Sequence, residues 1–533
     1  MAEYLSPGVY VEEIETGPRP IEGVSTSTTG MVGQTERGPT VPRLVTSWEE
    51  YTRWYGDYID RVPGGIACKF LPYAVKGFFD NSGQRVFIAR IVPTGATAAS
   101  TNLAGSSGST LVAANGPGLW GNHILVRITP ASLAVSTGPT ANWFRMTLLY
   151  YRDGIPNPFV DPTDINNFGN PNRKDPDVIE DYDNLSIIPT DSNYAQSEVN
   201  SASKLVVLTV GGRPNDVALP NAVLTNGTGS GDPDITRYQG STADPVDQQT
   251  GLLGLSRIRD ISLLAVPDEV VLPLIRNDII QQCESLKDRF AILYATETEQ
   301  SAFGTLRPPL DSSYGAYYLP WVRVLAAHTP EGHLLVPAQG HIAGIYARVD
   351  DDRGVHKAPA NEIIQGIITQ DLGNNAKPLA YLLDKGDQDV LNPKGVNVIR
   401  DFRADGRAIR VWGARTMTSD PLWRYVNVRR LFIFIEVSID RGSQWAVFEP
   451  NYEDTWASIR LSISSFLRSL WRNGALAGTS TDEAFFVKCD RTTMLQEDFD
   501  GGRLICLIGV APTKPAEFVI FRISQKTLDA TTS

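Results

Sequence analysis

The chain has 533 residues, of which 42% are hydrophobic, 20% charged and 9% aromatic. This balance excludes a disordered chain, and the length predicts two to four domains, each with its own core. The net charge of −12 excludes a general attraction to nucleic acid or anionic lipid, which needs clustered Lys and Arg.

The chain shows no targeting or membrane signal. The segment Met1–Pro7 has neither the basic nor the apolar part of a secretory signal, and runs such as Leu431–Ile435 are much shorter than the roughly 20 residues of a membrane helix. We therefore expect a cytoplasmic protein that does not insert into a membrane. The cysteines are far apart and form no CxxC pair, which predicts reduced, buried thiols. They are Cys68, Cys283, Cys489 and Cys506.

Residues 1–25 are predicted to form an extended N-terminal arm. After the turn signal at Pro7-Gly8, an alternating strand pattern begins, and it has no nearby partner. Its residues are Val9, Tyr10, Val11 and Glu12. The following Gly17-Pro18-Arg19-Pro20 rules out a tight hairpin, because proline cannot donate to a strand ladder.

Residues 26–94 and 256–375 are predicted to form one discontinuous α/β middle domain. In its first part we expect strands at 29–33 and 85–92, and helices that begin at the capping residue Ser47 and span 70–79. In its second part, strands at 261–266 and 290–295 flank a helix that we expect Asp268 to cap. The pattern is a βαβ unit, which is typical of parallel strands.

Between these parts, residues 95–255 are rich in Gly, Ser, Thr, Asn, Asp and Pro and contain short strand patterns, for example at 124–128 and 205–210. We interpret this region as an inserted, β-rich outer domain. The segment Gly227–Gly231 lacks the Lys-Ser/Thr ending of a phosphate-binding loop and is predicted to be a flexible loop.

Residues 376–512 are predicted to form a C-terminal α/β domain, and residues 513–533 a C-terminal arm. The expected strands lie at 396–402, 409–412, 445–448, 484–489 and 503–510, and the expected helices span 423–439 and about 454–471. The arm contains a last strand, at 517–524, after Pro512 and Pro515. Its apolar residues are Phe518, Val519, Ile520, Phe521 and Ile523. The fold class is therefore α/β (α+β multidomain).

No residue set has the spacing of a catalytic, cofactor or metal site. His328 and His333 flank a Pro/Gly turn rather than sharing one helix face, and the acidic Asp350–Asp352 lacks the glycine and glutamate of a calcium loop. No Gly-x-Ser-x-Gly motif is present. We expect no catalytic, cofactor or metal residues, and no enzyme.

Several separate motifs resemble the contractile phage tail sheath family, including sheaths of phage-tail-like injection systems. They occur in the family's order at both ends and in the core. They are Ser6–Glu13, Gly118–Asn122, Gly354–Asn361, Val411–Thr416, Asn427–Leu431, Phe448–Asn451, Gly474–Leu476 and Ala511–Phe518.

The resemblance implies a structural subunit that polymerises as a helical tube, with six-fold order, around a rigid inner tube. It also implies that the terminal arms add as strands to neighbouring subunits, and that contraction drives the inner tube through a target membrane. The implied partners are neighbouring sheath subunits, the inner tube protein, and the baseplate and terminator proteins. Assembly would occur in the bacterial cytoplasm, with the product a phage tail or a released particle.

Two alternatives remain open. Contact with the inner tube is assigned to the helix at 454–471 with Arg460, Arg468 and Arg472, but the apolar face of this helix fits a core and its arginines fit a solvated rim. The rival function is an α/β enzyme that binds a nucleotide or sugar at the βαβ unit, although no catalytic constellation supports it.

Overall fold

The structure is a computed structural model, and it describes residues 20–59, 67–105, 108–134, 142–372 and 376–520. The chain divides into two compact units. We call Ser25–Arg353 with Ala358–Val426 the sheet unit, and Met1–Val24, Gly354–Lys357 and Asn427–Ser533 the helical unit.

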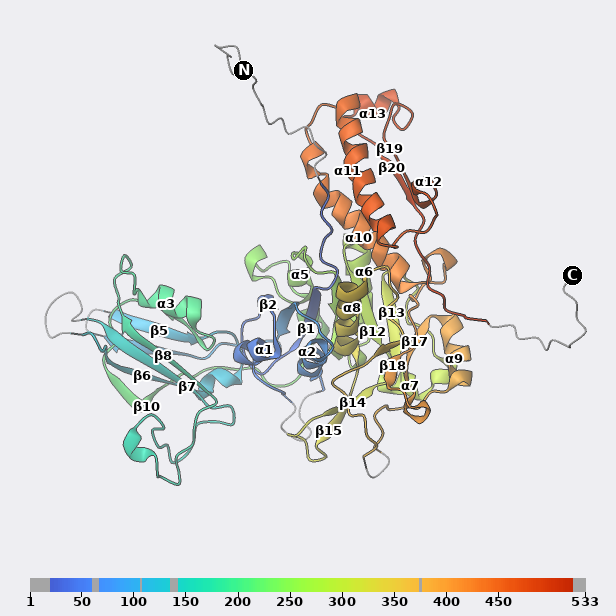
Figure 1. Cartoon of the computed structure of the whole chain (residues 1–533). Coiled ribbons are helices and arrows are strands. Elements are labelled where there is room, and N and C mark those ends of the chain that lie inside the picture. Colours follow the sequence, from blue (N-terminus) through green and yellow to red (C-terminus); the bar gives the residue numbers. More distant parts are fainter. Residues whose placement is uncertain (1–19, 60–66, 106–107, 135–141, 373–375, 521–533) are drawn as a thin grey trace, which may run out of the picture. The chain divides into compact units, whose positions relative to one another are not determined.

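The sheet unit contains a nine-stranded mixed sheet (Figure 1). In spatial order its strands are β16 (Glu362–Ile363), β18 (Ile409–Val411), β17 (Val396–Asp401), β13 (Gly315–Leu319), β12 (Phe290–Tyr294), β11 (Leu263–Ala265), β1 (Thr29–Gln34), β3 (Val86–Ile91) and β2 (Arg43–Val45). The six from β17 to β3 are parallel, and β2, β16 and β18 run antiparallel to their neighbours.

Helices cover both faces of this sheet. A Cβ atom on Gly30 would meet Leu255, whereas one on Gly33 would meet Leu71. Because residues three apart on a strand point to opposite faces, these neighbours lie on opposite sides of the sheet. One face is covered by α2 (Leu71–Asp80) and α8 (Gln339–Arg353), and the other by α4 (Ile235–Gln239), α5 (Gly251–Ser256) and α6 (Ile275–Leu286).

Outside the insert, the unit also contains several short elements. They are α1 (Trp48–Tyr55), α7 (Glu297–Ser301), α9 (Lys385–Leu391) and the hairpin of β14 (Val322–Leu325) and β15 (His333–Val336). Ser47 caps α1 as predicted, since its side chain accepts a hydrogen bond from the Glu50 N–H.

Most predicted elements of the α/β region are confirmed. The strands expected at 29–33, 85–92, 261–266 and 290–295 are β1, β3, β11 and β12, and β11 pairs with β12 in parallel. The expected strands at 396–402 and 409–412 are β17 and β18. These two continue the sheet of β1 past residue 376, where the sequence pattern had suggested a domain boundary.

The prediction that Asp268 caps the helix after β11 is wrong. That helix, α6, begins at Ile275, after Pro273, because proline disfavours a helical conformation of the residue before it. Asp268 instead lies in a short 3-10 turn, Pro267–Val270, and its carboxylate is buried.

The inserted region folds as two antiparallel sheets around one core. One sheet has β10 (Val217–Val223), β6 (Ile124–Pro130), β7 (Phe144–Tyr150) and β8 (Val178–Leu185), and the other has β4 (Ser100–Gly105), β5 (Gly108–Ala114) and β9 (Val206–Thr209). Side chains from both sheets form this core, to which α3 (Ala195–Ala202) adds Ala195 and Val199. The strands expected at 124–128 and 205–210 are confirmed.

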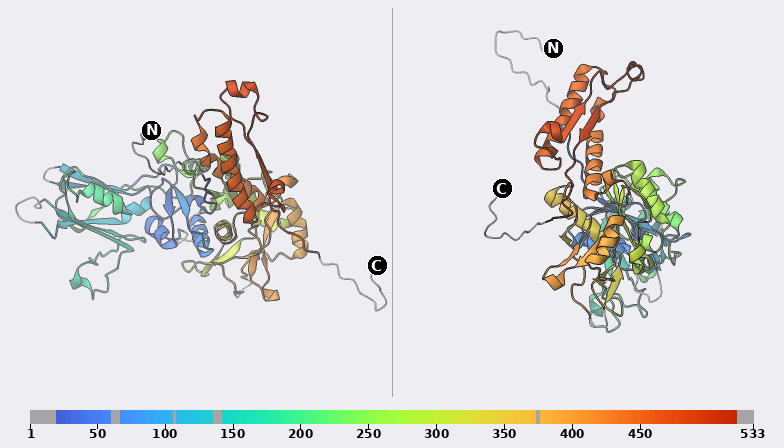
Figure 2. Two further views of the ribbon diagram at one scale, coloured as in Figure 1. Left: turned by 45° about the horizontal axis from the view of Figure 1, so that its top comes forward. Right: turned by 90° about the vertical axis from the view of Figure 1, so that its right-hand side faces the viewer.

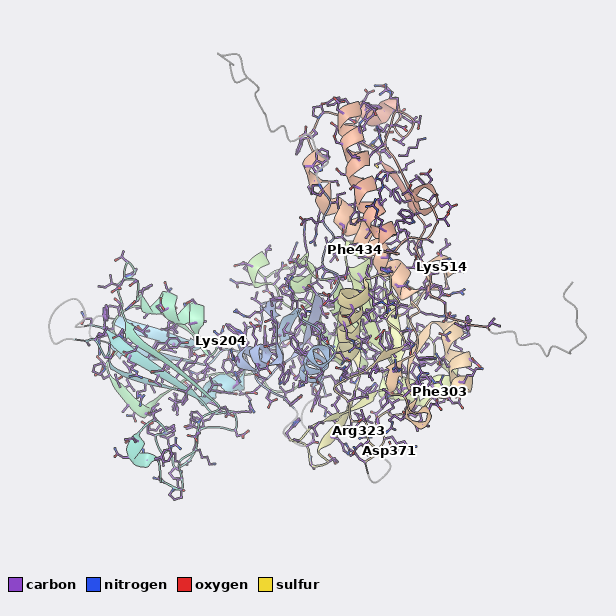
Figure 3. All side chains as sticks on the ribbon, in the orientation of Figure 1. Lys204, Phe303, Arg323, Asp371, Phe434 and Lys514 are labelled. Atoms are coloured by element: carbon purple, nitrogen blue, oxygen red, sulfur yellow. The ribbon has the colours of Figure 1, made fainter. Side chains whose placement is uncertain are left out.

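Several contacts join the insert to the α/β part within the sheet unit. The Tyr150 hydroxyl donates to Glu36 at 2.6 Å, and Arg152 forms an ion pair with Glu36 at 3.0 Å. The Lys204 ammonium lies 4.6 Å from the centre of the Trp54 ring of α1 (Figure 3). The insert and the α/β part are thus joined by a hydrogen bond, an ion pair and a cation–π contact.

The segment Gly227–Gly231 is a loop, as predicted, and hydrogen bonds hold its first residues in place. The Asn122 side chain accepts from the Gly227 N–H at 2.8 Å and donates to the Gly227 carbonyl at 2.9 Å. The next residue, Thr228, pairs with Thr97, so the two connections of the insert run side by side. A Cβ on Gly227 would lie 2.6 Å from the Gly118 carbonyl, so this position requires glycine for close approach.

The helical unit is built from two long helices and a small sheet (Figure 2). Its elements are α10 (Val426–Gly442), α11 (Glu453–Arg472), α12 (Thr481–Ala484), β19 (Phe485–Lys488), α13 (Gln496–Asp500) and β20 (Leu507–Val510). The apolar face predicted for α11 is confirmed as core, where it meets Leu431 and Ile435 of α10. Residues 20–24 run along α10: Gly23 packs on Phe434 (Figure 3), and the Val24 N–H donates to Ser438.

The predicted strand at 445–448 is wrong. Residues Gln444–Ala446 form a 3-10 turn, and Phe448 has a φ of 69° with a fully exposed side chain. The strand expected at 503–510 begins only at Leu507. Of the strand expected at 517–524, residues 517–520 form no strand, and 521–524 lie outside the described residues.

Candidate assembly surface

The sheet of the helical unit consists of β19 and β20 alone. They pair antiparallel from Phe485↔Val510 to Lys488↔Leu507. In the described part of the chain each strand therefore has one partner along its length, and its outer edge carries no ladder hydrogen bonds. Unpaired N–H and C=O groups at such edges can bind a further strand.

Contacts with α11 hold this sheet on one side. Phe485 and Val487 pack into the core that α10 and α11 share, whereas Phe486 points away and is 58% exposed. The Arg460 guanidinium donates to the Cys489 carbonyl just after β19. These contacts involve one face of the sheet, and on the opposite face Phe486 and Leu507 are 58% and 50% exposed among the described residues.

Backbone hydrogen bonds hold the chain end beyond β20 at Ala511 and Thr513. The Ala477 N–H donates to the Ala511 carbonyl at 2.8 Å, and the Thr513 N–H donates to the Ala475 carbonyl at 3.2 Å. Phe518, Val519 and Ile520 are then 73%, 68% and 78% exposed. Three consecutive large apolar side chains are thus left in solvent where the described residues end.

The structure does not bring the predicted arm residues together. Phe518, Val519 and Ile520 belong to no strand, and the others lie outside the described residues. Those others are Val9, Tyr10, Val11, Glu12, Phe521 and Ile523. Their pairing stays a prediction.

The three arginines of α11 have different surroundings. Arg460 is half-buried and forms an ion pair with Glu453 at 2.7 Å besides its bond to Cys489. Arg468 and Arg472 are exposed, and neither forms an ion pair with any carboxylate of the described residues. The two lie four residues apart and so share one face of the helix.

Sequence reasoning missed the exposed face of the small sheet. Phe486 and Lys488 on β19 face the same side as Gly509 and Leu507 on β20. The alternation Phe485-Phe486-Val487-Lys488 reveals a strand, but both aromatic residues are equally apolar. The sequence pattern therefore could not show which of the two is buried.

The rival nucleotide site was expected at the ends of the parallel strands. The order β3-β1-β11-β12-β13 reverses between β1 and β11, where sheets of this kind bind ligands. Here Asp268 fills that position: its carboxylate accepts from the Phe70 N–H at the start of α2 and from the Tyr238 hydroxyl. Burial raises the pKa of Asp268 to about 6. A protein carboxylate thus occupies the helix N-terminus that would bind phosphate.

The neighbouring strand end is also filled by internal contacts. The buried Glu269 pairs with Arg276 at 2.8 Å and accepts from the Tyr294 N–H and the Gln339 side chain, both at 2.6 Å. Arg276 in turn bonds Glu299 at 2.9 Å. These hydrogen bonds and ion pairs connect α6 and α8 to the sheet.

The histidines and aspartates singled out in the sequence are also used locally. His328 stacks on Tyr58 and bonds the Tyr73 hydroxyl at 3.0 Å, and Asp351 accepts from Gln84 at 3.1 Å. Among the residues the structure describes, no group of three His, Cys, Asp or Glu side chains could hold a metal ion. Within the same residues, no helix combines the length and apolarity needed to span a membrane.

Two family descriptions match adjacent parts of the chain. Residues 253–417 match the phage tail sheath protein central domain, and residues 418–526 match the phage tail sheath C-terminal domain. Together they cover the second half of the chain, from just before β11 into the C-terminal arm.

Curated relatives are matched over shorter stretches. A putative prophage major tail sheath protein of Pseudomonas aeruginosa (strain UCBPP-PA14) is 27% identical over 191 residues, which are 35% of this chain and 45% of that protein. The tail sheath protein of Enterobacteria phage T4 is 27% identical over 185 residues, 34% of this chain and 26% of that protein. The matches thus span less than half of either relative.

Solved structures resemble the whole chain. The anti-feeding prophage sheath in its contracted state has a TM-score of 0.55 at 22% identity and covers 98% of this chain and 99% of its own. The PVC sheath complex, also contracted, has a TM-score of 0.54 at 20% identity, covering 99% of both chains. A sheath tail protein of Listeria innocua has a TM-score of 0.57 at 12% identity, covering 93% of this chain and 96% of its own. At these identities the likeness concerns the fold.

Proposed function

This chain belongs to the contractile phage tail sheath family, whose members are structural proteins and not enzymes, and we propose that it polymerises into the contractile sheath of a phage tail or phage-tail-like injection particle. In this role it is a component of the particle, assembled in the bacterial cytoplasm. The family assignment and the filled strand ends both speak against the rival enzyme.

The open two-stranded sheet of β19 and β20 is the observation that carries the proposal. The pair packs on α10 and α11 with one face, and further strands can add to its unpaired edges. The N-terminal arm of one neighbour and the C-terminal arm of another supply these strands, with Val9, Tyr10, Val11, Glu12, Phe518, Val519, Ile520, Phe521 and Ile523 as the pairing residues. Each added main-chain hydrogen bond contributes about 0.5–1.5 kcal/mol, and alternate side chains fix the register.

The length and composition of the arms support exchange between subunits. Twenty extended residues span on the order of 65 Å, enough to reach another subunit. Because donor and acceptor surfaces differ, the contact is head-to-tail and propagates into a helix or ring. One related assembly, the baseplate of the anti-feeding prophage, is 6-fold symmetrised. For this chain we propose a six-fold helical homo-oligomer with baseplate and terminator partners, which the likeness to that assembly supports.

Contraction requires subunits to move without detaching. In our proposal the folded units move as rigid bodies, while the arms keep each subunit attached to its neighbours. The β-rich insert, residues 95–255, faces outward, and the C-terminal part from residue 376 faces the inner tube. The sheath then drives the inner tube through a target membrane.

For the tube contact we propose the exposed side of α11. Arg468 and Arg472 have no ion-pair partner in the described residues, so their guanidinium groups are available to an acidic tube surface. Arg460, named with them from the sequence, is already paired with Glu453 and the Cys489 carbonyl. The proposal therefore rests mainly on the other two.

The arm proposal is tested by deleting residues 2–19. This deletion keeps Ile21, which packs on Gly442 in the helical unit, and so spares the fold. Negative-stain electron microscopy of the chain expressed with its inner tube protein is expected to show tubes for the complete chain and dispersed, folded subunits for the deletion.

A matched pair of variants separates strand pairing from side-chain loss. Val9→Pro with Val11→Pro removes two N–H donors, whereas Val9→Ala with Val11→Ala keeps them. Tubes of normal length from the deletion or from the proline variant would overturn the strand-addition proposal.

A further inference from the structure

Two cysteines lie opposite each other at the end of the small sheet. The pairing of β19 with β20 ends at Lys488↔Leu507. The next position of this antiparallel register sets Cys489 against Cys506. Both side chains pack in one hydrophobic cluster, and each thiol influences the pKa of the other.

The register also favours a covalent bond at this position. The Ala511 N–H donates to the Ala484 carbonyl, and this bond flanks the pair Phe485↔Val510 and marks it as a non-hydrogen-bonded pair. Every second pair is of this closer kind, so the position that continues the register, 489 with 506, has an expected Cα separation of about 4.5 Å. Disulfides span Cα distances from about 4.4 to 6.8 Å. The separation expected from the register thus falls within the range that a disulfide spans.

The surroundings hold both side chains in place. Cys489 is fully buried in a cluster with Trp456 and Met494, and Cys506 packs against the same cluster while remaining partly exposed. Arg460 of α11 anchors the Cys489 carbonyl. The other two cysteines, Cys68 and Cys283, are buried in the sheet unit.

We propose that Cys489 and Cys506 are a covalent modification site, which a low-molecular-weight disulfide such as oxidised glutathione converts into an intrachain disulfide that joins the ends of β19 and β20.

The chemistry proceeds in two exchanges. The more accessible Cys506 thiolate attacks one sulfur of oxidised glutathione, and the first glutathione leaves as a thiolate that takes up a proton. The Cys489 thiolate then attacks the Cys506 sulfur of the mixed disulfide and expels the second glutathione. Two protein thiols lose two electrons and two protons, and one oxidised glutathione becomes two reduced ones.

Burial slows this reaction in a way that can be measured. It raises the pKa of both thiols, that of Cys506 to about 12. Because only the thiolate attacks, the oxidation rate is expected to rise about tenfold per pH unit between pH 7 and pH 9.

The consequence for assembly rests on the proposed function. A particle assembled in reducing cytoplasm keeps both thiols, and release into an oxidising exterior favours the disulfide. The bond then closes the loop 489–506 beside the sheet that binds the arms, which would stabilise the released sheath.

Peptide mapping of the full-length chain tests the proposal. The reduced protein is incubated with oxidised glutathione at pH 8.5, alkylated under denaturing conditions and digested with trypsin without reduction. Cleavage after Lys488, Arg491 and Arg503 is expected to yield Cys489–Arg491 linked to the peptide that begins at Leu504. Cys68 and Cys283 are expected to be recovered as alkylated thiols.

Variants give the matched controls. Cys506→Ser and Cys489→Ala each abolish the linked peptide, whereas Cys283→Ser leaves it unchanged. Oxidation is expected to raise the unfolding temperature of the wild type and of Cys283→Ser, but not of Cys506→Ser. The proposal would be overturned if Cys489 were recovered as a free thiol and Cys506 as a mixed disulfide with glutathione. Because the mapping uses dispersed subunits, its result is independent of whether the chain forms tubes.

Discussion

Phe486 lies over Gly509 of the neighbouring strand, so closely that a Cβ atom at position 509 would come 2.1 Å from the phenyl ring. Gly509→Ala is therefore expected to destabilise the helical unit. This is the reverse of the usual effect, because alanine within a strand normally makes the fold about 0.5–1 kcal/mol more stable than glycine does. In a Phe486→Ala background the same substitution is expected to stabilise it, because the ring is gone. Urea unfolding of the four chains of this cycle measures the reversal of sign. An equal effect of Gly509→Ala in both backgrounds would contradict the packing.

The Asn122 side chain makes two hydrogen bonds with the backbone of Gly227, where the two connections of the insert meet. Replacement with alanine leaves the Gly227 N–H and carbonyl without these partners, so we expect a loss of about 1–3 kcal/mol in the free energy of unfolding. Asn102→Ala, at an exposed position of β4, is the control. If both substitutions shift the urea midpoint equally, the two hydrogen bonds of Asn122 do not stabilise the fold as predicted.

The buried Asp268 predicts a pH dependence of the sheet unit. Its pKa is raised from 3.8 to about 6 by burial. The folded state therefore holds a proton that the unfolded state releases, and stability is lost as the pH rises through 6. Between pH 5.5 and pH 8 the contribution falls by about 1 kcal/mol. Asp268→Asn is expected to remove this part of the slope, whereas Asp405→Asn, in an exposed turn, retains it. Parallel slopes for wild type and Asp268→Asn would refute the assignment.

The sequence predicted the structure best where its pattern is compatible with only one arrangement. The strands around Met31, Ile88 and Ile292 are buried on both faces, so their continuous apolar runs fit a parallel sheet covered by helices. The apolar stripe of α11 likewise left one choice of buried face.

The sequence failed where distant residues decide the outcome. Asp268 has the chemistry of a helix cap, but Phe70 and Tyr238, far away in the chain, bind its carboxylate. The segment Trp445–Phe448 has a strand pattern, yet no strand lies beside it in the described residues. For the site, the spacing of Arg460, Arg468 and Arg472 placed them on one helix, but only the structure distinguishes the paired Arg460 from the other two.

Arg468 and Arg472 lead to the last prediction. Reversing both charges, Arg468→Glu with Arg472→Glu, is expected to abolish co-sedimentation with the inner tube protein, while Arg491→Glu, elsewhere on the helical unit, leaves it intact. Each exposed ion pair contributes only about 0.2–1 kcal/mol, but the contacts repeat along the tube and add by multivalency. Because exposed charges are screened, tube binding by the wild type should also weaken as salt is raised from 0.05 to roughly 0.5 M.

The form of failure would identify the true role of these side chains. If the double variant polymerises alone but does not retain the tube, the two arginines contact the tube. If it cannot polymerise even without the tube protein, they lie between sheath subunits, and the tube contact must be sought on another face. Unchanged tube binding by a variant that still polymerises would leave them as a solvated rim of α11, the alternative that the sequence pattern left open.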